Sequence, residues 1–203
     1  MSAATRPALA VPEALPKTAN PAPLGLAAFG VTTVVLSSIN AGILPPEATA
    51  AVVPLAFAFG GLAQLITGVL EFKNGNTFGT VAFTAYGAFW VWYSTLVWTI
   101  GAGWIKPPAP VGVGVVLLMW GVFTLYMWIA TFKANKGVFT TFLFLWITFL
   151  LLAGGDFGWA WGKKMGGIAG LMTGFIALYV SFAEVVNSTF GKEAIPLGRP
   201  ILD

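Results

Sequence analysis

The sequence predicts an all-α integral membrane protein with six transmembrane helices. Only 8% of its 203 residues are charged, 58% are hydrophobic, and the mean hydropathy is +0.86. A soluble domain normally carries about a quarter charged residues to solvate its surface. The apolar residues also gather into six segments, each close to the roughly 20 residues that cross the hydrocarbon core as a helix. The chain is therefore expected to lie in a bilayer.

The domain boundaries follow from these segments. Residues 1–19 contain Pro7, Pro12 and Pro16 but no apolar signal-peptide core, so we expect a flexible tail there. The transmembrane domain is expected over residues 20–190, and a second tail over residues 191–203. The predicted spans are residues 24–43, 51–72, 77–100, 110–132, 137–154 and 164–187. Turn-forming or charged residues separate the spans, and Gly154-Gly155 could end the fifth one early.

The first span begins at two prolines that favour an abrupt start. Asn20 is a good N-cap residue, and Pro21 at the first helical position costs nothing because that position has no intrahelical donor to lose. Pro23 removes a second free donor. The alternative is that this helix N-terminus attracts an anion, as broken helices do in transporters.

The basic residues predict the orientation. Seven Lys and Arg lie in the tails and the second and fourth loops, and three lie in the other loops. Basic residues favour the cytoplasmic side, so both termini are expected in the cytoplasm, with the protein in the plasma or inner membrane. The net charge of +3 is spread over short loops, which does not favour a nucleic-acid partner.

Several kinds of chemistry have no candidate residues. The chain has no Cys and no His, which removes thiolate chemistry, zinc sites and the usual near-neutral proton switch. It also lacks a phosphate-binding glycine loop with Lys and a GxSxG elbow. We therefore expect no enzyme, no metal and no cofactor, and proton handling must fall to carboxylates or water.

Small and polar residues recur at helical spacing on four of the spans, which is typical of a hydrated path. The set comprises Gly25, Phe29, Thr32 or Thr33, Leu36 and Asn40; Gly60, Gln64, Thr67 and Glu71; Thr80, Thr84 and Gly87; and Thr173, Ala177, Ser181, Glu184 and Ser188. Such residues also serve helix packing, and that explanation is favoured for any single Thr and for the Gly166, Gly170, Gly174 repeat. Gln64 favours the path, because an unpaired amide in lipid is costly.

Three carboxylates lie in or beside the spans: Glu71, Asp156 and Glu184. A carboxylate within a span is a functional candidate because insertion of an unpaired charge costs roughly 2.5 to 3.5 kcal/mol. Glu71 and Glu184 lie near cytoplasmic span ends, where pairing with Lys73 or Lys192 is the structural alternative to a proton relay.

Several ordered motifs resemble the acetate transporter family, the succinate-acetate permeases. They are NPAPLGL from Asn20, GGLAQ from Gly60, GNTFGTVAFTAYGAFW from Gly75, WGVFTLYMW from Trp120 and YVSFAEVVNSTFGKEAIPLG from Tyr179. The resemblance covers almost all of residues 20–198 and is weakest over residues 150–164. It implies a six-helix protomer with a central pathway, assembly into a homo-hexamer, and proton-coupled or channel-like transport of acetate, related monocarboxylates and, in some members, succinate. It also implies a constriction formed by Phe29, Tyr86 and Leu145.

Together these arguments predict a carrier or channel for acetate-like monocarboxylates, with protons and lipids as its other partners. The expected polar and small lining is Asn20, Thr32, Thr33, Gln64, Thr84 and Ala177, and Glu71 and Glu184 are candidate proton relays. No Arg or Lys lies within the expected lining, so the sequence predicts weak binding and fast passage, or passage as the protonated acid. Two alternatives stay open: a channel for neutral solutes such as urea, short amides or ammonia, and a membrane sensor or scaffold.

Overall fold

A computed structural model describes residues 18–202, and within that range the chain is built of helices. The principal helices are α1 (Ala22–Asn40), α2 (Thr49–Leu55), α3 (Gln64–Lys73), α4 (Thr77–Gly101), α5 (Pro110–Ala130), α6 (Lys136–Asp156) and α7 (Gly162–Phe190). Two 3-10 turns, Pro46–Ala48 and Thr131–Lys133, precede α2 and follow α5. The all-α prediction is confirmed.

The second predicted span is one continuous rod made of three pieces. A π-helical segment, Ala56–Ala63, joins α2 to α3, so the rod runs from residue 46 to residue 73. Pro54 inside α2 removes a backbone donor just before this segment, which favours a break in the regular hydrogen-bond ladder. The sequence pattern predicted the rod but not its wide middle turn.

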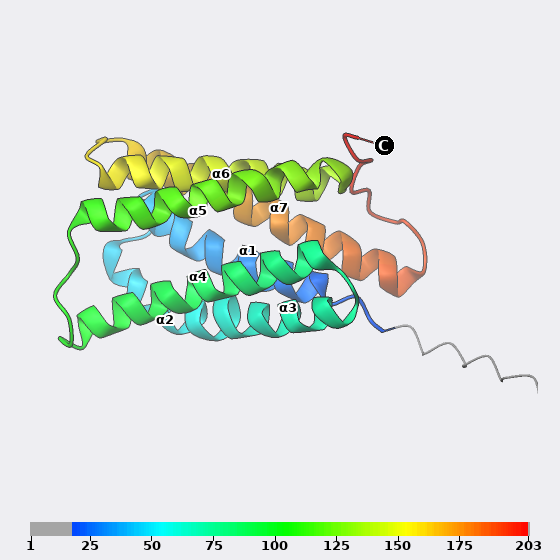
Figure 1. Cartoon of the computed structure of the whole chain (residues 1–203), viewed down its shortest axis with the longest axis horizontal. Helices are drawn as coiled ribbons and strands as arrows, with labels where there is room; N and C mark the ends of the chain where they lie inside the picture. The colour runs from blue at the N-terminus through cyan, green and yellow to red at the C-terminus, as the bar shows by residue number, and fades with distance from the viewer. Residues whose placement is uncertain (1–17, 203) are drawn as a thin grey trace, which may run out of the picture.

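Five of the rods in the described chain are long and apolar enough to cross a membrane: Ala22–Asn40, Pro46–Lys73, Pro110–Lys133, Lys136–Asp156 and Gly162–Phe190. The predicted third span corresponds to α4, which has 25 residues but a more polar composition. Its Thr, Gly and Ser residues lower its hydropathy, and it lies alongside the other helices in Figure 1.

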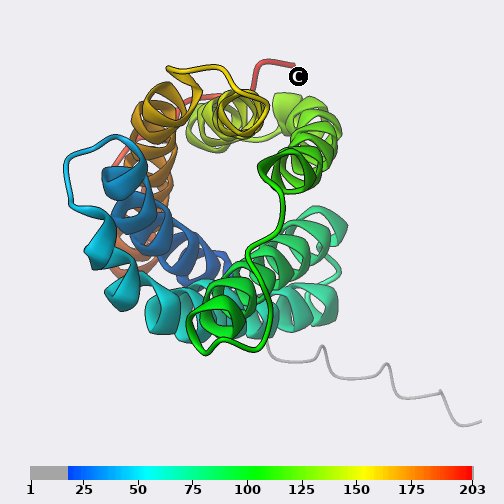
Figure 2. The ribbon, with the colours of Figure 1, turned by 90° about the vertical axis from the view of Figure 1, so that its left-hand side faces the viewer.

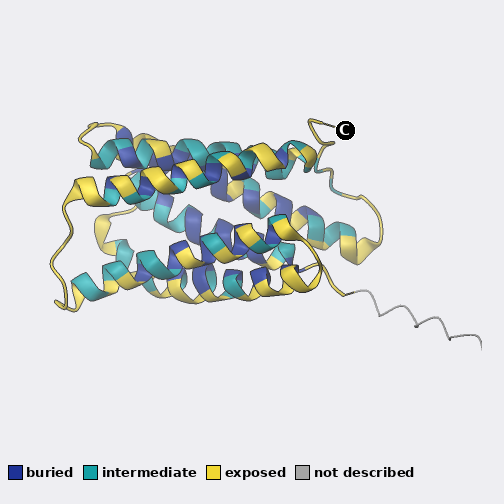
Figure 3. Cartoon of the chain, in the orientation of Figure 1, coloured by how far each residue is buried: buried dark blue, intermediate teal, exposed yellow. Residues whose placement is uncertain are grey.

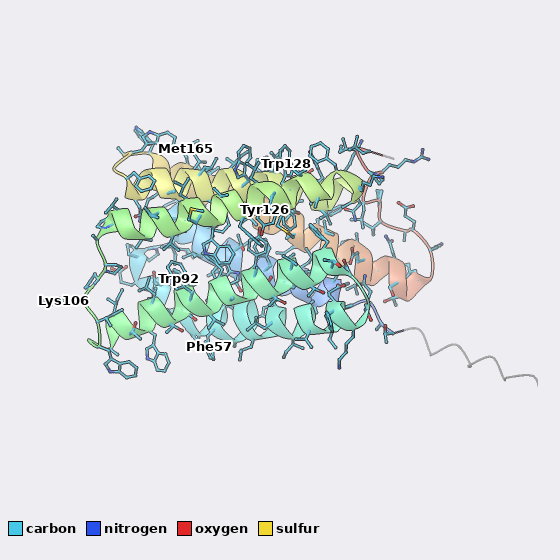
Figure 4. The ribbon with its side chains drawn as sticks, viewed as in Figure 1. Phe57, Trp92, Lys106, Tyr126, Trp128 and Met165 are labelled. Atoms are coloured by element: carbon cyan, nitrogen blue, oxygen red, sulfur yellow. The ribbon has the colours of Figure 1, made fainter. Side chains whose placement is uncertain are left out.

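The helices surround a common axis, as the end-on view in Figure 2 shows. Both ends of the described chain lie at one end of the bundle, which we call the terminal end; the opposite end is the distal end (Figure 1). Large apolar side chains are exposed on the outside, among them Phe72 at 74% and Phe175 at 58%. Figure 3 shows these exposed positions along the outer faces, and Figure 4 shows Phe57 and Met165 on the periphery. An apolar exterior is what lipid tails require.

Local chemistry sets the helix ends. The Asn20 carboxamide oxygen accepts a hydrogen bond from the Ala22 amide at 3.0 Å, and Pro21 has helical dihedral angles, as expected for an abrupt start. Asn76 and Asn135 cap α4 and α6 by accepting from the amides of Gly79 and Val138. The possible early end of α6 is not seen, because α6 continues through Gly154 and Gly155 to Asp156.

Close packing uses the small residues of α7. A Cβ on Gly170 would meet Ser37, and one on Gly174 would meet Val34, so these glycines let α7 approach α1. A Cβ on Gly166 would meet Leu152 of α6. The packing interpretation of this repeat is confirmed.

The C-terminal segment is tied to the bundle. The Asn187 carboxamide oxygen accepts from the amides of Ala194 and Ile195, and Tyr179 donates to the carbonyl of Pro196 at 2.6 Å. The Gly137 amide donates to the carbonyl of Leu197. Residues 191–202 therefore lie against the α5–α6 turn rather than extending as a tail. At the other end, the predicted tail 1–19 lies almost wholly outside the described residues.

Candidate substrate pathway

Two cavities lie between the helices, one toward each end of the bundle. The terminal cavity has a volume of about 160 Å³, and side chains from α1, α3, α4, α6 and α7 line it. Five residues expected in the pathway belong to its wall: Phe29, Gln64, Tyr86, Leu145 and Glu184. The distal cavity has a volume of about 200 Å³ and lies among α1, α4, α5, α6 and α7. The three expected constriction residues thus meet in one cavity.

An aromatic cluster lies between the two cavities, and we define it as Phe29, Tyr86, Phe89, Trp120 and Phe149. Tyr86 lines the terminal cavity, whereas Phe89, one turn further along α4, lines the distal cavity. Both rings contact Trp120, at centroid distances of 5.9 and 5.3 Å. Phe29 lies 5.9 Å from Tyr86, and Phe149 lies 5.4 Å from Phe89. A continuous set of ring contacts therefore connects the wall of one cavity to the wall of the other.

The Tyr86 hydroxyl has a polar partner inside this apolar region. It lies 2.9 Å from the Thr124 hydroxyl of α5, which itself donates to the carbonyl of Trp120 at 2.8 Å. Tyr86 is 3% exposed, so this hydrogen bond fixes the ring at little cost in unpaired polar groups. Sequence reasoning missed Thr124. A single threonine on an apolar span gives no signal until the helix that faces it is known.

Gln64 connects the cavity wall to the π-helical segment. It follows that segment directly, and its side-chain nitrogen donates to the carbonyl of Gly60 at 2.7 Å. The Gly60 carbonyl lies within the π-helical segment, so this bond ties the Gln64 side chain to the wide turn. Gln64 is thus both paired within its own rod and part of the wall of the terminal cavity.

Two carboxyl groups form hydrogen bonds to asparagines at the mouth of the terminal cavity. Glu184 accepts from the Asn20 side chain at 3.3 Å, and Glu71 accepts from the Asn76 side chain at 2.8 Å. Glu71 is 2% exposed, and its second carboxyl oxygen has no partner within the described residues. Asn20, Glu71 and Asn76 also share a polar hollow at the terminal end. Asn76 was not predicted from the sequence.

The expected alternative of lysine pairing for these two carboxyl groups is wrong. Across residues 18–202 one ion pair forms, between Asp156 and Lys163 at the distal end. Neither Lys73 nor Lys192 pairs with Glu71 or Glu184; instead, one oxygen of each carboxyl group accepts a hydrogen bond from an asparagine side chain.

Of the six described residues expected as the pathway lining, Asn20 lies in the polar hollow rather than in an axial cavity, and four line neither the hollow nor a cavity. In the described chain, Thr32, Thr33, Thr84 and Ala177 line neither axial cavity. Thr32 donates to the carbonyl of Ala28, and the buried Thr33 hydroxyl has no described partner. Thr84 faces Gly68 of α3 and is exposed, and Ala177 is fully buried. Their helical spacing predicted that they lie on helix faces made of polar or small residues, but those faces pack against neighbouring helices.

A bundle of membrane-crossing helices, with two axial cavities and an aromatic cluster between them, defines a multi-pass membrane protein of the transporter and channel class. The chain belongs to the GPR1/FUN34/yaaH family, whose model matches residues 2–198.

Two relatives and one solved structure illustrate the likeness. The succinate-acetate/proton symporter SatP of Escherichia coli K12 is 39% identical over 184 residues, which cover 90% of this chain and 97% of that protein. Acetate permease A of Emericella nidulans is 38% identical over 200 residues, covering 90% of this chain and 67% of that protein. The structure of the bacterial acetate channel SatP matches with a TM-score of 0.86 at 39% identity and covers 90% of this chain and all of that one. These relatives are transporters or channels and not enzymes.

Proposed function

We propose that this protein moves acetate and related small monocarboxylates across a membrane along the axis of each protomer. The observation that carries the proposal is the pair of cavities separated by the aromatic cluster, in a chain of the same family as proteins named for acetate transport. A short acid suits these cavities, because their walls are largely apolar and their volumes are small. Succinate is a further candidate substrate, in line with the name of the Escherichia coli relative.

In this proposal Phe29, Tyr86 and Leu145 form the constriction on the terminal side, and Gln64 supplies an uncharged polar group in the same cavity wall. Their support is that all four line one cavity. Because these four residues are uncharged, they can accommodate either a carboxylic acid or a weakly held anion without repelling it. The constriction therefore selects by size rather than by charge.

The candidate proton relay is the pair Glu71 and Glu184 at the terminal mouth. Both have asparagine partners rather than counter-ions, and Glu184 lines the terminal cavity beside Asn76. A carboxyl group that lacks a cation can exist in the neutral form and exchange a proton with a passing acid. This arrangement supports proton symport. The proposal also places both termini in the cytoplasm and six protomers in the assembly.

A channel for neutral solutes remains the second candidate, and the uncharged lining of the constriction favours it. Uptake of labelled acetate and labelled urea into proteoliposomes distinguishes the two, at a pH where acetate is ionised and with protein-free vesicles as the baseline. We expect acetate flux that unlabelled propionate inhibits, and no urea flux above the baseline. Urea flux without acetate flux would replace the proposal by its rival.

A further inference from the structure

We propose that Lys163, held in place by Asp156, forms a capture site for a small carboxylate at the distal mouth of the pathway. This inference rests on the proposed function. It assigns a role to the α6–α7 junction, where the sequence resemblance is weakest.

The geometry places one cation at the wall of the pathway. The Lys163 Nζ lies 2.6 Å from a carboxyl oxygen of Asp156, and both residues line the distal cavity. In the described chain, Lys163 is the one cationic residue that lines either axial cavity. The distal cavity therefore contains a cationic group that can bind a carboxylate, whereas no cationic residue lines the terminal cavity in the described chain.

The lysine of the pair can bind a second carboxylate. The Asp156 side chain is 6% exposed, whereas the Lys163 side chain is 58% exposed and reachable from solution. Asp156 is expected to keep its contact with Lys163, because a buried charge that loses its partner is costly. The Lys163 ammonium has three donor hydrogens, so a solute carboxylate can bind its exposed side while Asp156 holds the other.

Backbone contacts, rather than the ion pair, bring the two helices together. A Cβ on Gly162 would meet the backbone of Gly155, and a Cβ on Gly155 would lie 2.7 Å from the Lys163 amide nitrogen. These two glycines let α6 and α7 approach closely. The position of Lys163 is therefore set without its side chain.

The rest of the distal cavity fits the apolar end of a short acid. Trp92, Tyr93 and Leu117 contribute aromatic and aliphatic surface, and Asn40 and Thr49 add uncharged polar groups. Figure 4 shows Trp92 on α4 toward the distal end. With about 200 Å³ of space, the cavity can hold a small monocarboxylate whose charged end contacts Lys163.

Opposite substitutions in the two partners give the test. Lys163→Gln removes the cation and should raise the KM for acetate uptake about fivefold at unchanged kcat. Asp156→Asn removes the competing carboxylate and should lower KM by a similar factor. Lys164→Gln removes the same charge from the same helix turn, but Lys164 does not line the cavity, so KM should hardly change. Lys163→Arg should restore part of the affinity.

A second readout does not depend on transport. In the Asp156→Asn protein, sodium acetate should slow modification of the Lys163 amine by an acylating reagent, relative to sodium chloride, and should leave Lys164 unprotected, as mass spectrometry can measure. Protection without uptake would keep the site and reject the proposed function. If the protein takes up acetate, three results would each overturn the site. The first is an equal KM change in Lys163→Gln and Lys164→Gln, and the second is a KM change of the same sign in Lys163→Gln and Asp156→Asn. The third is that acetate does not protect Lys163. Absence of both uptake and protection would overturn both.

Discussion

At the scale of single residues, the ring and the hydroxyl of Tyr86 have different contacts. Its ring belongs to the aromatic cluster between the cavities, and its hydroxyl bonds to Thr124. Two substitutions separate these parts, because alanine removes both and phenylalanine removes only the hydroxyl.

Tyr86→Ala should widen the constriction and admit bulkier acids. We expect butyrate uptake relative to acetate uptake to rise roughly tenfold, the order of discrimination that an apolar pocket provides between homologues. Tyr86→Phe keeps the ring and should keep the selectivity, while it costs about 1 kcal/mol of stability through the lost hydrogen bond. Competition between labelled acetate and a series of longer acids measures both variants. Unchanged selectivity in Tyr86→Ala would remove Tyr86 from the constriction.

Glu71→Gln tests the proton relay. Glutamine can still accept from Asn76 but cannot carry a proton, so the variant should exchange acetate at equilibrium yet fail to accumulate it under an inward proton gradient. Glu193→Gln serves as the control, because Glu193 is exposed in the C-terminal segment. If Glu71→Gln accumulates acetate as the unsubstituted protein does, Glu71 is not part of the relay.

Some of these residues could be predicted from the sequence, and others could not because their role depends on contacts with other helices. The constriction residues came from the resemblance, and Gln64 from the cost of an amide in lipid. Thr124 and Asn76 could not be found, because their significance lies in partners on other helices, Tyr86 and Glu71. Thr84 shows the converse, since a polar face at helical spacing does not reveal whether it faces a cavity or another helix.

At the scale of helices, close backbone approach between α1 and α7 shapes one side of the pathway. Gly167 lies against the end of α1, where an added Cβ would come within 2.6 Å of the backbone carbonyl carbon of Asn40. Backbone cannot move aside as a flexible side chain can. The helix would therefore have to shift.

Gly167→Ala should destabilise the protein by about 1 to 3 kcal/mol, the usual cost of overpacking. Gly112→Ala makes the same change in α5, where an added Cβ meets nothing within 4 Å, and it should be neutral or slightly stabilising. Thermal unfolding of both variants in detergent measures the difference. Equal midpoints would show that α1 and α7 do not need this contact.

Helix positions were largely predictable because apolar length, prolines and asparagine caps act locally. The starts at Asn20, Asn76 and Asn135 follow from side chains that bond to nearby amides. The π-helical segment after Pro54 was not predictable, since a wide turn preserves the apolar pattern of its rod. The attachment of residues 191–202 was also missed, because it depends on the Phe132 carbonyl and the Gly137 amide of the distant α5–α6 turn.

At the scale of the whole molecule, the two axial cavities differ in their charged groups. The terminal cavity has Glu184 in its wall and Glu71 in the adjoining polar hollow, and the distal cavity has a lysine paired with an aspartate. Rings of the aromatic cluster lie between them, and in the proposed function these rings must move for a solute to pass. This arrangement is consistent with capture at the distal end, selection by size at the cluster, and release beside the carboxyl groups.

The most direct test of the central claim is the uptake of labelled acetate by proteoliposomes, with and without an imposed inward proton gradient and against protein-free vesicles. We predict protein-dependent acetate entry that the gradient drives above the equilibrium level. Entry to equilibrium alone would keep the substrate and the pathway but identify a channel. Acetate entry no faster than in protein-free vesicles, under either condition, would contradict the account.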